Sequence, residues 1–486
     1  MRLSELLREV EFEGSIKNDF DIKLVTDDSR LVRPGALFVC IRHRSFDGHT
    51  AAAEALASGA AAVVTQERLG LENELNVTDS RAAYARLCAA LCGHPERKLR
   101  MIGVTGTNGK TTVTTLIRNI LSDSGIKTLL TGTVCNRLGE ESLPSGLTTP
   151  KPPELYSLLA RAVLSGCEAS VAEASSQALA QGRLEGIAFD AAVFTNITRD
   201  HLDYHGTFEN YLAAKKKLFE HSEVSAVNLD DPRADEIFAA SSGKTVTFST
   251  VLDCADYTAK NISLLPEGVS FELVSKGRIE HINFASPGLF SVSNAMAAAV
   301  CAINLGVDPR SAAQSLARSK GVCGRLERVE CGTPYSVIID YAHTPDGLEQ
   351  VLRALRPSCR GKLIVLFGCG GDRDKTKRPL MGAAACKYAD TVIVTSDNPR
   401  SEEPMKIIGD ILKGTDKKRR GLFIEEDRRR ATALALSLAK PGDTVLLAGK
   451  GHEKYQLICG EKLPLDERET VREILGLPHD TGRKKP

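Results

Sequence analysis

The segment TGTNGKTT (residues 105–112) carries the residue types of a phosphate-binding loop. Gly106 and Gly109 allow backbone N–H groups to approach a phosphate and surround it. Lys110 can reach the β- and γ-phosphates of a nucleotide, and the hydroxyl of Thr111 can coordinate Mg²⁺. The run MIGV before the loop predicts a strand. The run TTVTTLIRNIL after it predicts a helix whose positive N-terminus faces the same anion. Val104 stands where a strict Walker A motif has its first glycine, so the loop is a variant form.

Six further apolar runs also end in polar and charged residues. Ligands of open α/β sheets bind at the carboxyl ends of the strands. Turn chemistry explains glycine, aspartate and asparagine at such ends, but it does not explain repeated Arg, His, Lys and Glu. We therefore expect at least one active site there. The segments are EASS (173–176), TNITRDHLDYHG (195–206), DYAHTPD (340–346), GCGGDRDK (368–375), TSDNPR (395–400) and GKGHE (449–453).

Two of these segments suggest a metal site. Glu173 and the cluster of Asp200, His201, Asp203 and His205 would lie near the phosphate loop, where carboxylate and imidazole groups suit Mg²⁺. Zinc is the alternative, but no cysteine or further histidine has suitable spacing. Taken alone, His201 would more often be a loop histidine bonded to the backbone.

Lys215 lies in the helical stretch YLAAKKKLF (211–219). A run of three lysines by itself favours a solvated helix face.

The whole chain has the composition of a multidomain globular protein. It has 486 residues, 42% hydrophobic and 26% charged, which excludes a disordered chain and suits several domains. The net charge of +1 argues against a nucleic-acid-coating protein. Short apolar runs alternate with helical patterns, which predicts α/β domains with parallel sheets. Polar stretches before MIGV and YSVIID predict boundaries that give domains 1–98, 99–326 and 327–486.

The N-terminus and the cysteines bear on the compartment. MRLSELLREVEFEG lacks an apolar signal-peptide core, and no run reaches the roughly 18 apolar residues of a membrane helix. The 13 cysteines show no paired CxxC spacing. We expect reduced thiols and a cytoplasmic protein without membrane insertion.

The motifs, taken in order, resemble the Mur ligase family of peptidoglycan synthesis. GTNGKTT, EASSQAL, TNITRDHLDYHG and YLAAKKKLF carry the resemblance in the middle of the chain. GRLE (324–327), DYAHTPD, GCGGDRDKTKRPLM, SDNPR and GKGHE carry it further, from about residue 24 to the last strand. The phosphate loop is shared with folylpolyglutamate synthases. DNPR with GKGHE is typical of the branch that adds meso-diaminopimelate rather than L-lysine.

The resemblance implies a reaction and its partners. The chain would use ATP and Mg²⁺ to join meso-diaminopimelate to the D-glutamate γ-carboxylate of UDP-MurNAc-L-Ala-D-Glu through an acyl phosphate. It implies a first domain that binds the uridine diphosphate end, a central P-loop-type ATPase domain, and a Rossmann-like third domain that binds the amino acid. We expect a monomer that binds no nucleic acid.

The resemblance also assigns residues. ATP would contact Gly106, Thr107, Asn108, Gly109, Lys110, Thr111, Thr112, Asn294, Arg325 and Asp340. The muramoyl dipeptide would contact Ser29, Thr148, Thr149, Ser175, Gln181 and Arg183. Diaminopimelate would contact Arg373, Asp397, Asn398, Pro399, Arg400, Gly449 and Glu453. Lys110, Glu173, His201 and Lys215 would be catalytic, with Thr111, Glu173, His201 and Lys215, as a CO₂-derived carbamate, around the metal.

Several alternatives stay open at this point. A folylpolyglutamate synthase would do the same chemistry on a folate tail, although DNPR, GKGHE and the extra N-terminal domain argue against it. An L-lysine-adding ligase and a P-loop switch that uses ATP only as a signal are the others. Arg400 has its own alternative, a surface ion pair with Glu402 or Glu403.

Overall fold

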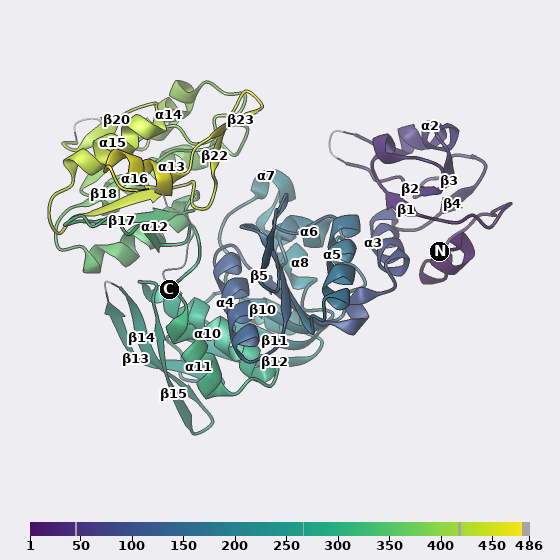
Figure 1. Cartoon of the computed structure of the whole chain (residues 1–486), viewed down its shortest axis with the longest axis horizontal. Coiled ribbons are helices and arrows are strands. Elements are labelled where there is room, and N and C mark those ends of the chain that lie inside the picture. Colours follow the sequence, from purple (N-terminus) through teal and green to yellow (C-terminus); the bar gives the residue numbers. More distant parts are fainter. Residues whose placement is uncertain (44–45, 266, 417–418, 479–486) are drawn as a thin grey trace.

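The structure, a computed structural model, describes residues 1–43, 46–265, 267–416 and 419–478. It has three α/β domains that follow one another along the chain, with the central domain between the other two (Figure 1). Among the described residues, no helix is long and apolar enough to cross a membrane. All 13 cysteines are free thiols.

The first domain is built on a small parallel sheet of order β1-β2-β3-β4. Its strands are β1 (Leu24–Thr26), β2 (Ala36–Val39), β3 (Ala60–Thr65) and β4 (Glu74–Asn76). Its helices are α1 (Leu3–Leu6), α2 (Ala52–Ala57) and α3 (Ser80–Leu91), with short 3₁₀ turns η1 (Leu7–Glu9), η2 (Ser29–Leu31) and η3 (Gly48–Ala51). The Asp79 carboxylate caps α3 by accepting from the N–H groups of Arg81 and Ala82.

The hydrophobic core of the first domain continues into the central one. Leu87 of α3 belongs to the same buried cluster as Leu155 and Tyr156 of α5 (Pro152–Leu164). The 3₁₀ turn η4 (Pro95–Lys98), which joins the domains, packs against α5 as well. A domain boundary at 98/99 therefore separates the sheets of the first and central domains but cuts through their common hydrophobic core. The boundary itself stays a proposal.

The central domain contains an eleven-stranded sheet of order β15-β14-β13-β12-β11-β10-β5-β9-β6-β7-β8. The parallel part comprises β5 (Arg100–Thr105), β6 (Thr128–Thr131), β9 (Ala169–Glu173), β10 (Phe189–Phe194), β11 (Ser222–Asn228), β12 (Lys244–Ser249) and β13 (Tyr257–Leu265). Antiparallel strands extend both edges: β7 (Asn136–Leu138), β8 (Glu141–Leu143), β14 (Gly268–Ser275) and β15 (Arg278–Phe284). Besides α5, the helices are α4 (Lys110–Asp123), α6 (Ser176–Ala180), α7 (Leu202–His205), α8 (Phe208–Lys216), α9 (Ala234–Ala240), α10 (Leu289–Asn304) and α11 (Pro309–Arg318).

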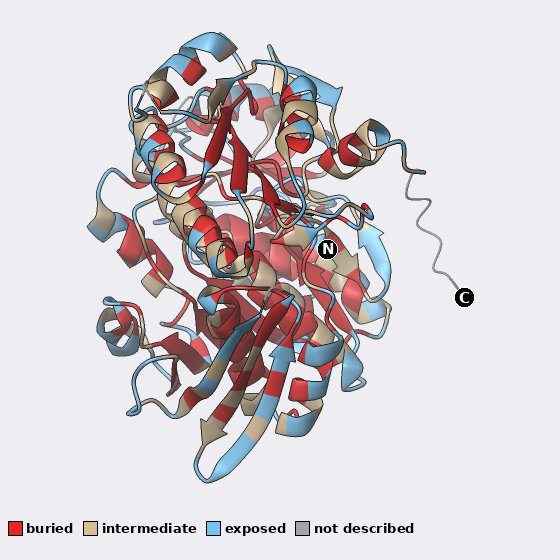
Figure 2. Ribbon diagram, turned by 90° about the vertical axis from the view of Figure 1, so that its left-hand side faces the viewer, coloured by how far each residue is buried: buried red, intermediate tan, exposed pale blue. Residues whose placement is uncertain are grey.

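Strand β5 lies inside this sheet, and its buried residues alternate between the two faces. Ile102 and Val104 join the cluster that contains α4 and α10, whereas Met101 joins the cluster on the other face. Figure 2 shows this buried interior as the red strands and helix faces. The packing fixes the point at which β5 ends, and hence the phosphate loop that follows it.

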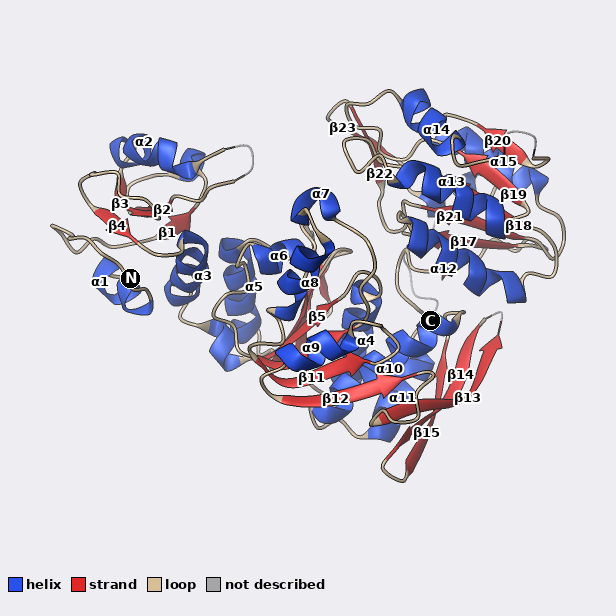
Figure 3. Cartoon of the chain, turned by 180° about the vertical axis from the view of Figure 1, so that it is seen from behind, coloured by secondary structure: helices blue, strands red, loops and turns tan. Residues whose placement is uncertain are grey.

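The third domain is a six-stranded sheet of order β16-β17-β21-β18-β19-β20, parallel apart from the β16–β17 pair. Its strands are β16 (Glu327–Arg328), β17 (Ser336–Asp340), β18 (Leu363–Phe367), β19 (Thr391–Val394), β20 (Leu422–Ile424) and β21 (Thr444–Ala448), with a separate hairpin of β22 (Tyr455–Ile458) and β23 (Glu461–Pro464). Its helices are α12 (Pro345–Leu355), α13 (Lys377–Tyr388), α14 (Pro404–Leu412), α15 (Arg428–Leu438) and α16 (Glu467–Ile474), with the 3₁₀ turn η5 (Arg356–Ser358). Helices cover both faces of the sheet (Figure 3). The proposed boundary at 326/327 falls immediately before β16.

The predicted fold class, three α/β domains with parallel sheets, is confirmed, but the antiparallel edges were not foreseen. Strands β14 and β15 are joined by a tight turn at Lys276 and Gly277, which both have positive φ, as two-residue hairpin turns require. The alternation of apolar runs with helical patterns predicted parallel strands, but the described residues between β13 and β15 form no helix.

Candidate functional site

A cavity of about 240 Å³ opens where the carboxyl ends of the central strands face the third domain. Residues from both domains line it, so the site is shared between them. Fifteen of the predicted site residues line this cavity: Thr107, Asn108, Gly109, Lys110, Thr111, Thr112, Thr148, Glu173, Ser175, Asp200, His201, Lys215, Asn294, Arg325 and Asp340.

The phosphate loop has a backbone that only glycine fits at two positions. Gly106 has φ +155°, and a Cβ added there would lie 1.9 Å from Thr195 Oγ1. Gly109 has φ +87°, and a Cβ there would lie 2.5 Å from Asn294 Oδ1. Helix α4 begins directly after Gly109, and within the described part of the chain no side chain caps its first N–H groups. Those groups are therefore available to an anion.

Lys110 is folded onto the same loop. Its Nζ donates to the carbonyl oxygens of Gly106, at 2.8 Å, and Thr107, at 3.0 Å. Burial lowers the pKa of Lys110, while the carboxylates of Glu173 and Asp200 oppose that change. The loop thus holds an amine of lowered basicity beside the helix N-terminus.

Glu173, at the end of β9, forms the centre of an oxygen-rich cluster. Its Oε2 accepts from the hydroxyls of Thr111, at 3.0 Å, and Thr133, at 2.9 Å, and its Oε1 accepts from the Thr133 N–H at 2.8 Å. A carboxylate and a hydroxyl side by side are ligands that Mg²⁺ prefers, so this part of the predicted set fits the metal.

His201 lies on the rim of the cavity. It is the N-cap residue before α7 and has a positive φ of 52°, its side chain is 43% exposed, and its Nε2 is 3.4 Å from Asp200 Oδ2. Burial and the neighbouring Lys110 and Lys215 lower the pKa of His201, and Asp200 opposes them. Among the described residues, no group of three or more His, Cys, Asp or Glu is placed to hold a metal, so the assignment of His201 to Mg²⁺ stays a prediction.

His205, the second histidine of the cluster, is buried with its Nε2 3.0 Å from Ser176 Oγ. It packs against the ring of Tyr211 and does not line the cavity. The structure therefore separates the two histidines that a zinc site would need together.

Lys215 is buried, so the solvated-face interpretation of the lysine run is wrong for this residue. Its exposed fraction is 1%, and its Nζ lies 4.6 Å from the centre of the Tyr211 ring inside the cavity. Burial and the nearby Lys110 lower its pKa well below the usual value for lysine. Lys217, two residues on, is exposed. The run thus has one lysine inside the site and one outside.

The residues assigned to the muramoyl dipeptide form a hydrogen-bonded group next to Glu173, apart from Ser29. Arg183 donates to the carbonyl oxygen of Thr149 at 2.6 Å and to Gln181 Oε1. Thr149 Oγ1 donates to Glu173 O at 2.6 Å and contacts Ser175 Oγ. Ser29 lies in the first domain, in η2, and does not line the cavity. Its role stays a prediction.

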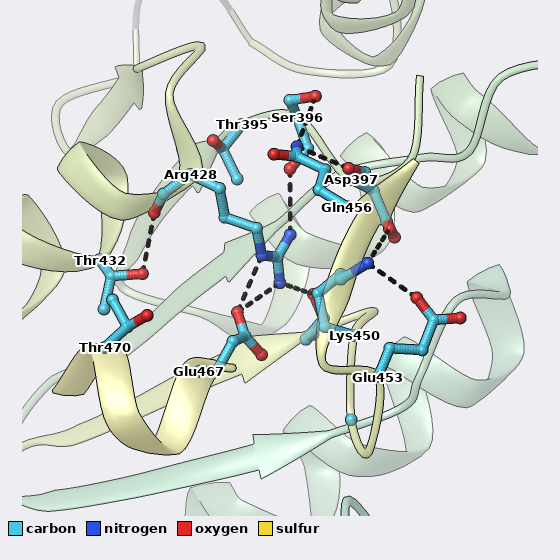
Figure 4. A network of polar contacts seen from close by, with 12 residues as sticks. Thr395, Ser396, Asp397, Arg428, Thr432, Lys450, Glu453, Gln456, Glu467 and Thr470 are labelled. Atoms are coloured by element: carbon cyan, nitrogen blue, oxygen red, sulfur yellow. Dashed lines mark hydrogen bonds and ion pairs between the residues drawn. The ribbon is translucent and has the colours of Figure 1, made fainter. Parts of the chain in front are cut away.

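The residues assigned to diaminopimelate lie in the loops that follow β18, β19 and β21 of the third domain, and Figure 4 shows two of them, Asp397 and Glu453. Asn398 Nδ2 donates to Glu453 Oε2 at 2.9 Å, which joins the loops after β19 and β21. A Cβ added at Gly449 would lie 2.8 Å from Asp397 Oδ2, so these loops touch there too. None of the seven assigned residues lines the cavity beside the phosphate loop.

Arg400 lies next to the loop after β18. Its Nη1 donates to Gly371 O at 2.8 Å. The acids that could have paired with it have other partners: Glu402 binds Arg378 at 2.8 Å and Glu403 binds Lys406 at 3.1 Å. The surface-pair alternative is therefore wrong for both acids.

Four further residues, which the sequence did not single out, make contacts at these candidate sites. Asp346 accepts from Asn108 Nδ2 at 3.0 Å and thereby ties the third domain to the phosphate loop. It stood within DYAHTPD, so its place at a strand end was the available signal. Lys450, with no exposed surface, donates to Asn398 and Glu453. The buried pair of Arg428 and Glu467 gave no local signal at all.

Fold and site together define a three-domain α/β protein. The phosphate loop of its central domain and residues of its Rossmann-like third domain line the same cavity. The chain belongs to the Mur ligase family. Family models match residues 21–90 ("Mur ligase family, catalytic domain"), 104–302 ("Mur ligase middle domain") and 324–451 ("Mur ligase, glutamate ligase domain").

Similar proteins support this membership over the full length. The UDP-N-acetylmuramoyl-L-alanyl-D-glutamate--2,6-diaminopimelate ligase of Syntrophomonas wolfei is 43% identical, covering 98% of this chain and 99% of its own. A solved structure of an enzyme with the same name is 34% identical, with a TM-score of 0.71 over 98% of this chain and 99% of that one. Folylpolyglutamate synthase of Mycobacterium tuberculosis, 20% identical over 76% of this chain and 91% of its own, with a TM-score of 0.61, shares the fold.

Proposed function

We propose that the chain is an ATP-dependent ligase that adds meso-diaminopimelate to the D-glutamate γ-carboxylate of UDP-MurNAc-L-Ala-D-Glu in peptidoglycan synthesis. The observation that carries this proposal is the 43% identity, over nearly the whole of both chains, to a ligase with that printed activity. The shared cavity agrees, because it brings a phosphate loop together with residues of the third domain.

The chemistry explains why a nucleotide is needed. A carboxylate and an amine form a salt at neutral pH, so the carboxylate must first become an acyl phosphate, with ADP as the leaving group. The amine then attacks the acyl carbon, and phosphate leaves from the tetrahedral intermediate. Lys110 and the N-terminus of α4 would hold the phosphates while Arg183 and Ser175 orient the carboxylate-bearing substrate.

Thr111 and Glu173 would hold Mg²⁺, whose positive charge would offset the repulsion between a triphosphate and a carboxylate. Contacts between domains would complete the site. Asp346 of the third domain accepts from Asn108 Nδ2 of the phosphate loop at 3.0 Å and from Thr198 Oγ1 at 3.3 Å. These contacts hold the third domain over the loop, where closure would exclude water from a reactive acyl phosphate.

A ligation assay tests the proposed function. With ATP, UDP-MurNAc-L-Ala-D-Glu and meso-diaminopimelate we expect phosphate release and the tripeptide product, and no release above background when either co-substrate is omitted. A folylpolyglutamate synthase would respond instead to a folate and glutamate. A P-loop switch would release phosphate without forming an amide. Either pattern would overturn the proposal.

We propose further that Lys215 is carbamylated and acts as an anion. Its neutral amine can attack CO₂, which forms an N–C bond and releases a proton. The lowered pKa supplies that neutral amine, because burial and Lys110 both disfavour a second ammonium in the cavity. The product is a carboxylate that suits a second Mg²⁺.

We expect Lys215→Arg to be inactive although it keeps a positive charge, because the proposed role is anionic. Lys215→Glu is expected to retain a little activity. A ¹³C NMR signal from enzyme equilibrated with ¹³C-bicarbonate, lost in both variants, would report the carbamate directly. An active Arg variant, or an active preparation whose Lys215 is a bare ammonium, would contradict the idea.

Cellular context follows from the same proposal. ATP and a nucleotide-linked precursor as substrates, together with thirteen free thiols, support a cytoplasmic site of action. A monomer remains our expectation, and the elution volume of the purified chain tests it.

A further inference from the structure

A buried ion pair between Arg428 and Glu467 lies beside two of the loops assigned to the amino acid, those after β19 and β21 (Figure 4). Arg428 is the first residue of α15 and Glu467 the first of α16. Both side chains are 1% exposed, and Arg428 Nε donates to Glu467 Oε1 at 2.8 Å. Neither side chain can touch a substrate, so any role in the reaction must act through other residues.

The remaining guanidinium N–H groups of Arg428 bind two backbone carbonyls at strand ends. Nη1 donates to Ser396 O at 3.2 Å, and Nη2 donates to Ala448 O at 2.8 Å. The residue after Ser396 is Asp397, and the residue after Ala448 is Gly449. Strands β19 and β21 are not neighbours, because β18 lies between them. Arg428 thus spans β18 and connects the two loops.

We propose that the Arg428–Glu467 pair positions the amino-acid site by fixing the loop after β19 relative to the loop after β21. The proposal rests on the proposed function, since it assigns those loops to diaminopimelate. The planar guanidinium fork suits such a role, because it holds two acceptors at a set separation, which an ammonium cannot do.

Glu467 sets the direction of that fork. Its Oε1 accepts from Nε at 2.8 Å and lies 2.8 Å from Nη2, and its other oxygen has no hydrogen-bond partner among the described residues. A small displacement of either loop would separate Asn398 from Glu453 and move Asp397 away from Gly449. Misplacement of binding groups by about 1 Å can cost roughly 100-fold in rate.

A double substitution separates positioning from simple stabilisation. Replacing a buried ion pair by apolar residues of similar size is often neutral for stability, whereas removing one partner is not. We expect Arg428→Met alone to lower the melting temperature, and Arg428→Met/Glu467→Leu to recover most of it. In the double variant we still expect KM for meso-diaminopimelate to rise roughly 10- to 100-fold, with KM for ATP within about twofold of wild type.

The matched control is Arg429→Met/Glu473→Leu, which removes an exposed pair between the same two helices and should leave both KM values unchanged. A thermally restored Arg428/Glu467 double variant with wild-type KM for diaminopimelate would overturn the proposal, as would an equal rise in KM for ATP. If the double variant does not fold, Arg428→Lys keeps the cation beside Glu467 but loses the fork, and the same two outcomes apply.

A failure of the proposed function would look different. Wild-type enzyme would then not use diaminopimelate, and the amino acid that it does use takes its place in the comparison.

Discussion

Lys110→Ala is expected to lose ligation by roughly 10²–10³-fold while the protein still folds. The ammonium lies between the loop carbonyls of Gly106 and Thr107, at the start of α4, where a transferred phosphoryl group would be held. A preorganised cation at that point stabilises charge that develops during transfer, and alanine leaves nothing to replace it. The loss should appear in kcat more than in KM for the amino acid, because the residues assigned to diaminopimelate lie in the third domain.

Lys127→Ala is the matched control for this variant. Lys127 is exposed and donates to Ser165 O at 2.6 Å, and it does not line the cavity. The control should keep wild-type ligation, and both variants should show wild-type circular dichroism. Near-normal turnover of Lys110→Ala would remove the assignment of the phosphate loop.

The phosphate loop was predictable because its chemistry is local. Strand, loop and helix occupy consecutive residues, and the types needed at Gly106, Gly109 and Lys110 follow from that geometry alone. Glu173 was predictable for a related reason: it ends a buried strand, and parallel strands bring their carboxyl ends to one edge.

Lys215 shows where local pattern fails. Its neighbours in sequence are lysines, so residue types alone favoured solvent, and only the packing of α8 against the site buries it. The resemblance to a family supplied what the pattern could not. Arg428 and Glu467 are harder still, because they lie far apart in the chain at the starts of two different helices and become partners only once the third domain has folded.

Arg400 is the residue expected to choose between meso-diaminopimelate and L-lysine. The two amino acids differ by one carboxylate at the far end of the side chain, and a guanidinium can bind that carboxylate with two parallel hydrogen bonds. The backbone of Arg400 is held firmly, with a positive φ of 54° and hydrogen bonds to Leu457 and Cys459 of the β22–β23 hairpin. Only Nη1 has hydrogen-bond partners within the described part of the chain, and both are backbone carbonyls, Gly371 O and Asn398 O.

A bound lysine would therefore leave the guanidinium desolvated without its anion, and sites that demand a polar partner can reject analogues that lack it by roughly 10⁴-fold. We expect wild-type enzyme to use meso-diaminopimelate and almost no L-lysine in a competition assay. Arg400→Ala should lose roughly 10²–10³-fold in kcat/KM for diaminopimelate, with ATP binding intact, because Arg400 does not line the cavity beside the phosphate loop. Arg353→Ala, which removes an exposed arginine from α12, should change neither value.

Full efficiency of Arg400→Ala with diaminopimelate would show that another residue makes the choice. Arg373 and Lys450, two other cations at these strand ends, would then be the positions to substitute next, and of the two only Arg373 is exposed.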